Sequence, residues 1–427
     1  MSHWRRYPLY KPSVVEWLGD VPDEWKQSRL RFLCSITTGS KNTENSDPTG
    51  QYPFFVRADT VERLHTYSFD EEAILTAGDG VGVAKVFHYY KGKFDVHQRV
   101  YVLTKFKGIL ANFLFLYFKQ NLADEVLKLS AKSTVDSLRL PMLQNFPVLI
   151  PSIPEQNAIA ALLNCETTRI DALIQKKERQ IELLQERCTA LISHAVTKGL
   201  DPSVPIKDSG VEWLGTIPEG WNVTKFSRAA FYQEGPGLRY WQFSDSGIRV
   251  ICVTNITDKG IDFSNYEKFI SNDDYEENYQ HFTVKKNDLL LSSSGNSWGK
   301  VARYLSDEKV ILNTSTIRIN ELTPSKMILS FINLILQSKP CREQLGLMMT
   351  GSCQPNFGPS HLSQLIVPLP PIEDQIKIAR HVDKLLQNDE IIISKIGKSV
   401  TILKEYRSAL ISAAVTGKID LRHEVQA

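Results

Sequence analysis

The chain has 427 residues, of which 42% are hydrophobic and 23% are charged, with 50 Lys and Arg residues against 48 Asp and Glu residues. This length is too great for one ordinary hydrophobic core and predicts two or three domains, while the composition excludes disorder over most of the chain. A formal net charge of +2 lacks the strongly basic signature of many nucleic-acid-binding domains, so basic groups for such a function must be local.

The N-terminal ten residues and the cysteines favour a soluble, cytoplasmic protein without a structural metal. Residues 1–10 lack the apolar core of a secretory signal, and the longest apolar runs, 113–118 and 327–336, are far shorter than the ~20 residues that span a bilayer. The six cysteines show no CxxC spacing and no paired histidines beside them. We therefore expect free, buried thiols rather than a zinc site or a disulfide framework.

The sequence contains a tandem repeat. Val15–Gly19 recurs as Val211–Gly215 at an offset of 196 positions, and each copy continues with Pro-x-x-Trp. Two later matches, both at an offset of 219 positions, join Ile150–Gln156 to Leu369–Gln375 and Ala190–Thr197 to Ala409–Thr416. The length difference of 23 residues therefore falls between Trp25 and Ile150 of the first copy and their counterparts in the second.

The segments that differ in length, about 25–150 and 221–370, have the pattern of mixed α/β domains. Short runs rich in β-branched and aromatic residues predict strands at Phe54–Val56, Arg99–Leu103, Val250–Val253 and Thr316–Ile319. Helices are predicted at Leu110–Leu129 and Ser325–Met348. The two domains share a faint skeleton, in which Gly82–Lys85 corresponds to Gly299–Ala302 and Ala131–Thr134 to Thr350–Cys353.

The segments that keep their length predict two long helices. A capping-box pattern at Ser152–Glu155 opens the first helix, which ends near Gly199. A mostly apolar row with a spacing of seven residues runs through both copies, at Leu163, Ile170, Lys177, Leu184 and Leu191 and at Val382, Asp389, Ile396, Leu403 and Leu410, with Leu173, Ile174, Leu385 and Ile392 beside it. This period favours a coiled coil, and a helix packed on its own domain is the alternative. Equal lengths favour two rods that pack on each other, each ~60 Å long.

No catalytic or nucleotide-binding motif is evident. The glycine turns at 78–82 and 294–300 fit neither a phosphate loop nor a dinucleotide fingerprint, and neither HExxH nor GxSxG occurs. The Asn/Asp-Pro-Pro-aromatic signature of an amino-methyltransferase is also missing. Two interpretations of the glycine turns stay open: plain hairpin turns, or loops that bring backbone N–H groups, Lys85 and Lys300 to DNA phosphates.

The four tryptophans of the repeat, Trp17, Trp25, Trp213 and Trp221, lie where each long helix meets a domain. We interpret them as structural anchors, because Trp buries a large area, with stacking on a ligand as the alternative.

The Glu-Trp-Leu-Gly junction with its Pro-x-x-Trp, the Ile-Pro-x-Ile-Pro-Glu-Gln entry to a long helix, and the second copy of each resemble the specificity subunit of type I restriction-modification enzymes. The resemblance covers nearly the whole chain. It implies two similar α/β target-recognition domains, each followed by a long helix, with the two helices paired as an antiparallel coiled coil. The expected boundaries are 1–152 for target-recognition domain 1, 153–198 for spacer helix 1, 199–371 for target-recognition domain 2, and 372–427 for spacer helix 2 and the C-terminal tail.

The resemblance also implies a function without catalysis by this chain. Each domain would read one half of a bipartite, asymmetric double-stranded DNA site, while the helices set the spacing and dock two methyltransferase (modification) subunits. Restriction-translocase subunits would join them. No cofactor is expected in this chain, since S-adenosylmethionine, ATP and Mg would belong to the partner subunits, and no membrane is involved.

Base recognition is expected from Asn, Gln, Arg and Lys side chains on loops of the two recognition domains. The candidates are Arg57, Lys85, Gln98, Arg99, Lys132, Asn255, Asn296, Lys300 and Gln354. Two other functions stay open: a coiled-coil scaffold that binds no DNA, and a stand-alone nucleotide-dependent enzyme. The repeat further predicts that the Thr416–Gly417 end lies near the residues that precede Trp17, just as Thr197–Leu200 precede Trp213.

Overall fold

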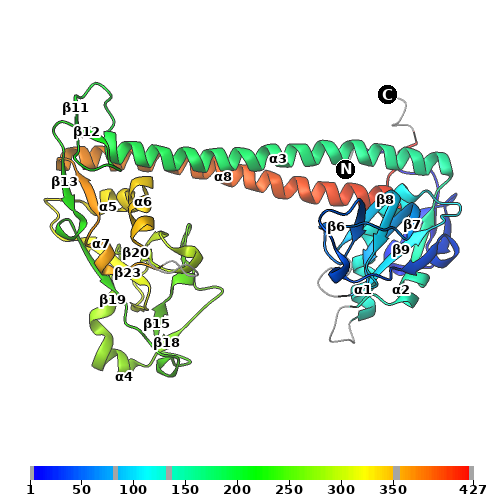
Figure 1. Cartoon of the computed structure of the whole chain (residues 1–427), viewed down its shortest axis with the longest axis horizontal. Coiled ribbons are helices and arrows are strands. Elements are labelled where there is room, and N and C mark those ends of the chain that lie inside the picture. Colours follow the sequence, from blue (N-terminus) through cyan, green and yellow to red (C-terminus); the bar gives the residue numbers. More distant parts are fainter. Residues whose placement is uncertain (1–3, 80–84, 131–136, 350–355, 423–427) are drawn as a thin grey trace. The chain divides into compact units, whose positions relative to one another are not determined.

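A computed structural model describes residues 4–79, 85–130, 137–349 and 356–422 (Figure 1). The chain divides into two compact units, each of them mixed α/β. Unit 1 comprises residues 1–178 and 397–427, and unit 2 comprises residues 179–396. Within the described ranges, no helix has the length and apolar character needed to cross a membrane.

Unit 1 is built around a six-stranded sheet with the order β4-β9-β7-β8-β5-β6, in which only β5 and β8 pair in parallel. Helix α1 packs on β7 and β8, and its aromatic side chains share one core with those strands (Figure 1). The elements are β4 (Ser35–Thr38), β5 (Tyr52–Phe55), β6 (Val61–Leu64), β7 (Phe69–Ala77), β8 (Phe87–Val96), β9 (Val100–Thr104) and α1 (Ala111–Ser130).

The rest of unit 1 joins this domain to the long helices. Two antiparallel strand pairs, β1 with β2 and β3 with β10, are separate from this sheet. These elements are β1 (Tyr10–Pro12), β2 (Asp20–Pro22), β3 (Lys26–Arg29), α2 (Leu140–Asn145), β10 (Pro147–Ile150), the first part of α3 (Ile153–Lys198) and the last part of α8 (Ile372–Val415).

Unit 2 has two four-stranded sheets, with the orders β14-β23-β20-β21 and β18-β15-β22-β19. As in unit 1, one pair is parallel, here β15 with β22. The strands are β11 (Ile206–Asp208), β12 (Thr216–Pro218), β13 (Asn222–Lys225), β14 (Ala230–Glu234), β15 (Ile248–Ile251), β16 (Ile256–Thr257), β17 (Gly260–Ile261), β18 (Phe269–Ile270), β19 (Thr283–Val284), β20 (Leu289–Ser292), β21 (Val301–Arg303), β22 (Val310–Leu312), β23 (Thr316–Glu321) and β24 (Ile366–Leu369).

The helices of unit 2 correct one prediction. The segment predicted as a single helix, Ser325–Met348, forms two helices, α5 (Leu329–Gln337) and α6 (Lys339–Met348). The break follows from Ser338, whose hydroxyl accepts a hydrogen bond from the Cys341 N–H, and from Pro340, which cannot donate to the preceding turn. Two short helices, α4 (Asn272–Asp274) and α7 (Pro359–Leu362), complete the unit.

The additional residues of the second domain enter mainly at one place. The offset of 196 persists through β5 and β15, because Tyr52 and Ile248 open these two strands. Further along, Asp79 and Ser294 occupy equivalent isolated bridges at an offset of 215. Most of the extra length therefore lies between β15 and Ser294, where unit 2 has β16, β17, β18 and α4.

The long helices contact each other within each unit. In unit 1, Arg407 of α8 forms an ion pair with Asp171 of α3 at 2.8 Å, and Lys404 forms one with Glu178 at 2.9 Å. In unit 2, Asp389 of α8 lies 3.6 Å from Arg187 of α3 and is buried, with 3% of its surface exposed.

The seven-residue row is the less exposed side of both helices, with Leu163, Ile170, Val382, Asp389, Ile396 and Leu410 buried. Two of the residues that were expected to support the row do not, because Leu173 and Ile392 are each 42% exposed. Their positions fall outside the stripe that the neighbouring helix covers.

Equivalent glutamines attach the first turn of each long helix to its recognition domain. The side chain of Gln156 accepts a hydrogen bond from the Leu110 N–H at 2.7 Å and donates to the carbonyl of Pro151 at 2.9 Å. Gln375 accepts from the Ile328 N–H at 3.0 Å and donates to the carbonyl of Pro370 at 2.9 Å. Both glutamines are completely buried, so a change at either leaves backbone groups without a partner.

The two chain ends meet in unit 1, which confirms the expected closure. The Tyr10 hydroxyl donates to the carbonyl of Gly417 at 3.1 Å, and the Lys418 ammonium donates to the carbonyl of Leu18 at 2.8 Å. Gly417 has a φ of 72°, and a Cβ there would lie 3.2 Å from the Trp25 ring. In unit 2, Gly199 ends α3 with a φ of 75° against Trp221. Trp25 and Trp221 are 1% and 3% exposed, as expected of structural anchors.

Candidate nucleic-acid interface

In unit 1, three segments bring polar side chains to one end of the six-stranded sheet: the ends of β5 and β7 and the turn from β8 to β9. Here the carboxylate of Asp79 bridges two guanidinium groups. Its Oδ1 accepts a hydrogen bond from Arg57 at 3.0 Å, and its Oδ2 accepts one from Arg99 at 2.5 Å. These three residues, which we call the Arg-Asp-Arg cluster, include both arginines that were predicted to contact DNA.

The cluster holds its charged groups in place and still leaves guanidinium N–H donors exposed to a ligand. Burial opposes ionisation of Asp79, but the hydrogen bonds and charges of Arg99 and Arg57 outweigh it and hold the pKa of that carboxyl below its usual value. Asp79 is therefore ionised at neutral pH. The Arg57 and Arg99 side chains remain 43% and 58% exposed, so N–H groups that Asp79 does not use face solvent. Such groups are suited to guanine edges and phosphates.

The loop after β4 extends this surface. Its Asn42 accepts a hydrogen bond from the exposed Gln98 side chain at 2.5 Å, which orients one more predicted residue. Gly39 allows the loop to come this close, because it has no Cβ. A Cβ at this position would lie only 1.8 Å from the carbonyl oxygen of Val96, so only glycine fits. Lys85, at the entry to β8, is also exposed.

Unit 2 has an equivalent end of a sheet with different chemistry. The isolated bridge between Asp79 and Ser137 in unit 1 corresponds to the bridge between Ser294 and Asn356 in unit 2. In both units the following residue also donates its N–H to the partner segment, Leu138 to Gly78 and Phe357 to Ser293. The carboxylate that holds two arginines in unit 1 is thus replaced by a serine.

Two predicted residues lie on the adjoining turns of unit 2. Asn296 is exposed in the 3₁₀ turn Gly295–Ser297. The ammonium of Lys300 forms an ion pair with Asp258 at 3.0 Å, and a third of the Lys300 side chain is exposed. Lys300 is therefore held near the surface by a carboxylate, as the arginines of unit 1 are.

The position of Asn255 corrects the expectation that it contacts DNA. Asn255 is 1% exposed, and its side chain already makes three hydrogen bonds inside its own loop. It accepts from the Cys252 N–H at 2.9 Å and donates to the carbonyls of Asp262 at 3.0 Å and Tyr266 at 2.8 Å. With no exposed donor or acceptor, this amide organises the loop.

An exposed aromatic pair was not anticipated from the sequence. Tyr240 and Trp241 are 84% and 69% exposed and meet edge to face, with ring centroids 5.5 Å apart. They form the 3₁₀ turn Tyr240–Gln242, which follows the same strand of the repeat as the Asn42 loop does in unit 1. Gln242 anchors the turn by donating to the Tyr279 hydroxyl at 2.6 Å. The signal was present in the sequence as a Tyr-Trp pair a few residues after a Gly-Pro-Gly turn.

The last two predicted residues, Lys132 and Gln354, lie outside the described residues. In the part of the chain that the structure describes, no group of three or more His, Cys, Asp or Glu side chains has a metal-binding arrangement. The described cysteines are free thiols. Cys34, Cys252 and Cys341 are buried as expected, but Cys165 is exposed and Cys188 is half-buried, because both lie on the long helix α3.

Comparison with known proteins gives consistent matches. The family model described as the type I restriction modification DNA specificity domain matches residues 22–183 and again residues 222–401. The type I restriction enzyme MjaVIII specificity subunit of Methanocaldococcus jannaschii is 24% identical over 94% of this chain and 95% of its own length. The EcoDI specificity subunit of Escherichia coli is 22% identical over 94% and 90%.

Solved structures share the fold. A chain from a study of complex assembly and conformational transition in the type I R-M system aligns with a TM-score of 0.70 at 12% identity, over 92% of this chain and 98% of that one. The HsdS subunit of Thermoanaerobacter tengcongensis aligns with a TM-score of 0.50 at 13% identity, over 93% and 98%. With two family domains that cover most of its length, this chain belongs to the specificity subunits of type I restriction-modification enzymes.

Proposed function

We propose that this chain is the DNA sequence-recognition subunit of a type I restriction-modification system and that each recognition domain reads one half of a bipartite, asymmetric site. The observation that carries the proposal is the pair of equivalent sheet ends, one in each copy of the family domain, which present different exposed polar and aromatic side chains on the same support. A shared support with different contact residues is what two different half-sites require.

The two domains would use different chemistry. In domain 1, Arg57 and Arg99 would each direct two donors at a guanine edge in the major groove, with Asp79 fixing their orientation. In domain 2, Tyr240 and Trp241 would stack on sugars or bases, while Lys300 would neutralise a phosphate.

The long helices would form an antiparallel coiled coil that sets the spacing between the half-sites. In unit 1 the ion pairs join residue 171 to 407 and residue 178 to 404, so the numbers run in opposite directions. The buried seven-residue row supports the same pairing. Helix α3 has 46 residues and thus extends ~70 Å, a length on the scale of two turns of DNA.

Catalysis would belong to the partners. Two methyltransferase subunits would dock on the helices, restriction-translocase subunits would join them, and S-adenosylmethionine, ATP and Mg would bind to those subunits. This chain would contribute the choice of sequence, in agreement with the specificity subunits it resembles.

A domain exchange tests the proposal. Replacing residues 25–150 with the matching segment of a relative, within the enzyme assembled from all its subunits, should change one half of the methylated sequence and leave the other half and the spacer unchanged. Sequencing of methylated sites measures all three. An unchanged consensus would overturn the assignment, and methylation without any selected sequence would favour a scaffold.

A further inference from the structure

The junctions between helix and domain are equivalent in the two units, but among the described residues only the junction of unit 1 is filled. In unit 1, the Tyr7 side chain lies between the start of α3 and the end of α8. Its ring packs edge to face on Trp25, with centroids 5.7 Å apart, and its hydroxyl donates to Glu155 at 2.6 Å. The guanidinium of Arg422 lies over the ring, 5.0 Å from its centroid. Tyr7 is consequently only 6% exposed.

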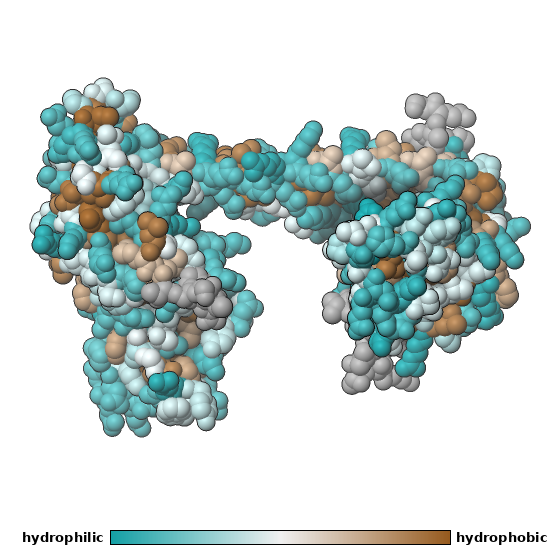
Figure 2. All heavy atoms as spheres, in the orientation of Figure 1, coloured by the Kyte–Doolittle hydropathy of each residue, from teal (hydrophilic) through white to brown (hydrophobic). Residues whose placement is uncertain are grey.

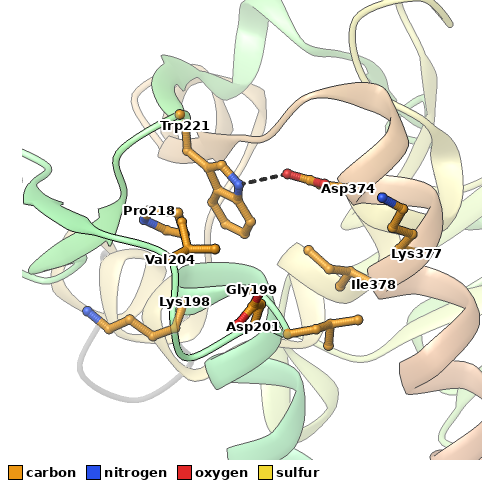
Figure 3. Close-up of a pocket in the computed structure, with 11 residues that line it drawn as sticks. Lys198, Gly199, Asp201, Val204, Pro218, Trp221, Asp374, Lys377 and Ile378 are labelled. Atoms are coloured by element: carbon orange, nitrogen blue, oxygen red, sulfur yellow. Dashed lines mark hydrogen bonds between the residues drawn. The ribbon is translucent and has the colours of Figure 1, made fainter.

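In unit 2, the same place is a cavity of about 390 Å³ (Figure 3). Its walls repeat those around Tyr7: Trp221 stands for Trp25 and Asp374 for Glu155. The indole N–H of Trp221 points to Asp374 and donates to it at 3.3 Å (Figure 3), whereas in unit 1 the equivalent carboxylate, Glu155, accepts from the Tyr7 hydroxyl. The carboxylate of Asp374 keeps a second oxygen for another donor.

The topology of the repeat explains the cavity. In unit 1 two separate segments cover the junction, residues 4–9 from one end of the chain and residues 417–422 from the other. In unit 2 a single linker, between α3 and β11, takes the place of both segments. Its Asp201–Ser203 turn, closed by Ser203 N–H to Asp201 Oδ1 at 2.9 Å, repeats the Asp420–Arg422 turn at 3.1 Å. No segment of the linker is then left to take the place of Tyr7.

The apolar rim of the cavity is exposed as a result. Leu200 is 41% exposed, whereas its counterpart Ile419 is 5% exposed under the N-terminal segment. Val204 and Ile206 are 38% and 61% exposed. Figure 2 shows apolar residues gathered over this end of unit 2, where β11, β12 and β13 lie. An exposed apolar rim around a cavity is typical of a surface that a partner covers.

We propose that this cavity receives a tyrosine side chain, carried on an extended segment of a methyltransferase subunit, in the way that unit 1 receives its own Tyr7. This inference rests on the proposed function. The aromatic ring would pack on Trp221 and its hydroxyl would donate to Asp374, while flanking residues of the segment would cover Leu200 and Val204. Because the site in unit 1 is already filled, only one of the two methyltransferase copies would use this contact.

Filling the cavity from within this chain tests the proposal. Val204→Tyr places a tyrosine on the cavity wall, and Ser203→Tyr places one next to that wall, at the position that matches Tyr7 by the repeat offset of 196. Lys207→Tyr is the matched control, because Lys207 is exposed on the same segment but does not line the cavity. Each full-length variant is mixed with methyltransferase subunits, and native mass spectrometry counts the bound copies while thermal unfolding verifies the fold.

We expect the parent chain and Lys207→Tyr to bind two copies. At least one filled variant with parental thermal stability should bind one copy normally and the other at least tenfold more weakly. If both filled variants fold and bind two copies with unchanged affinity, the cavity is only a consequence of the topology and the inference is wrong. If both unfold, Asp374→Ala decides in the same assay, by the same tenfold criterion. A parent chain that binds no methyltransferase subunit would instead overturn the proposed function, and this inference with it.

Discussion

The sheet ends of the two recognition domains share a framework but differ in the side chains they expose. Unit 1 presents two arginines fixed by one carboxylate, whereas unit 2 has Ser294 at the place of that carboxylate and presents an aromatic turn. The buried glutamines that attach the helices are the same in both units. The framework is thus conserved within the chain where packing requires it, and the exposed side chains differ freely because the fold does not depend on them.

The largest predicted effect tests the shared framework. Gln156→Ala and Gln375→Ala should each destabilise the local structure by ~3 kcal/mol, because each removes a buried side chain that pairs with backbone groups. Native-state hydrogen exchange at the Leu110 and Ile328 amides measures the two losses separately, and ~100-fold faster exchange is expected in each. Exposed Asn157→Ala is the control. Clearly unequal losses would show that the two junctions are not equivalent.

The second prediction concerns the arginines of unit 1. Arg57→Ala or Arg99→Ala should weaken selection of one half-site by ~2 kcal/mol, since a guanine would lose a pair of hydrogen bonds. Lysine at either position should restore only the salt-dependent part of the affinity. Binding titrations on sites that differ in a single half measure this. Equal weakening on both half-sites would mean that the arginines contact phosphates alone.

The third prediction concerns the aromatic turn of unit 2. Trp241→Ala should weaken binding to the other half-site by ~1 kcal/mol through lost stacking and should leave stability within ~0.5 kcal/mol, because the ring is 69% exposed. Trp241→Phe should keep most of the affinity. Tryptophan fluorescence that does not respond to DNA, together with unchanged affinity of Trp241→Ala, would show that this residue does not contact DNA.

The smallest expected effect is the pH dependence of the Arg-Asp-Arg cluster. The pKa of Asp79 is lower in the folded protein than its ordinary value of 3.8, so its contribution to stability is complete above about pH 4 to 5 and declines as the pH falls through the folded pKa. Asp79→Asn should therefore cost at most ~1 kcal/mol at neutral pH and approach no cost at low pH. Ser294→Ala, at the equivalent position, should show no such dependence. Unfolding of both variants between pH 2 and 7 measures the contrast.

The repeat made much of the fold predictable. Invariant spacing indicated the long helices, and the matching junctions indicated that Gly417 lies beside the first residues of the chain, as the Tyr10 contact confirms. Strand positions such as β5 and β9 followed from β-branched and aromatic runs. The split between α5 and α6 was missed because apolar periodicity outweighed Ser338 and Pro340 in the interpretation.

The candidate site was less predictable because exposure decides it. Asn255 has a side chain suited to base recognition, but its amide forms hydrogen bonds inside its own loop. These bonds depend on the positions of the carbonyls of residues 262 and 266, which the local sequence does not indicate. Trp241 was missed because tryptophan is usually buried, whereas this ring is exposed. The cavity beside Trp221 results from a segment that one junction has and the other lacks, so no local pattern of residues signals it.

Unit 1 contains residues from both ends of the chain, and this affects how the protein is made. Unit 2 is continuous from residue 179 to 396, so a ribosome can release all of it before unit 1 has its last part. The Trp25 junction of unit 1 stays open until residues 417–422 emerge. The recognition domain that is synthesised first is therefore the one that closes last, and until then its open junction exposes apolar surface that is prone to aggregation.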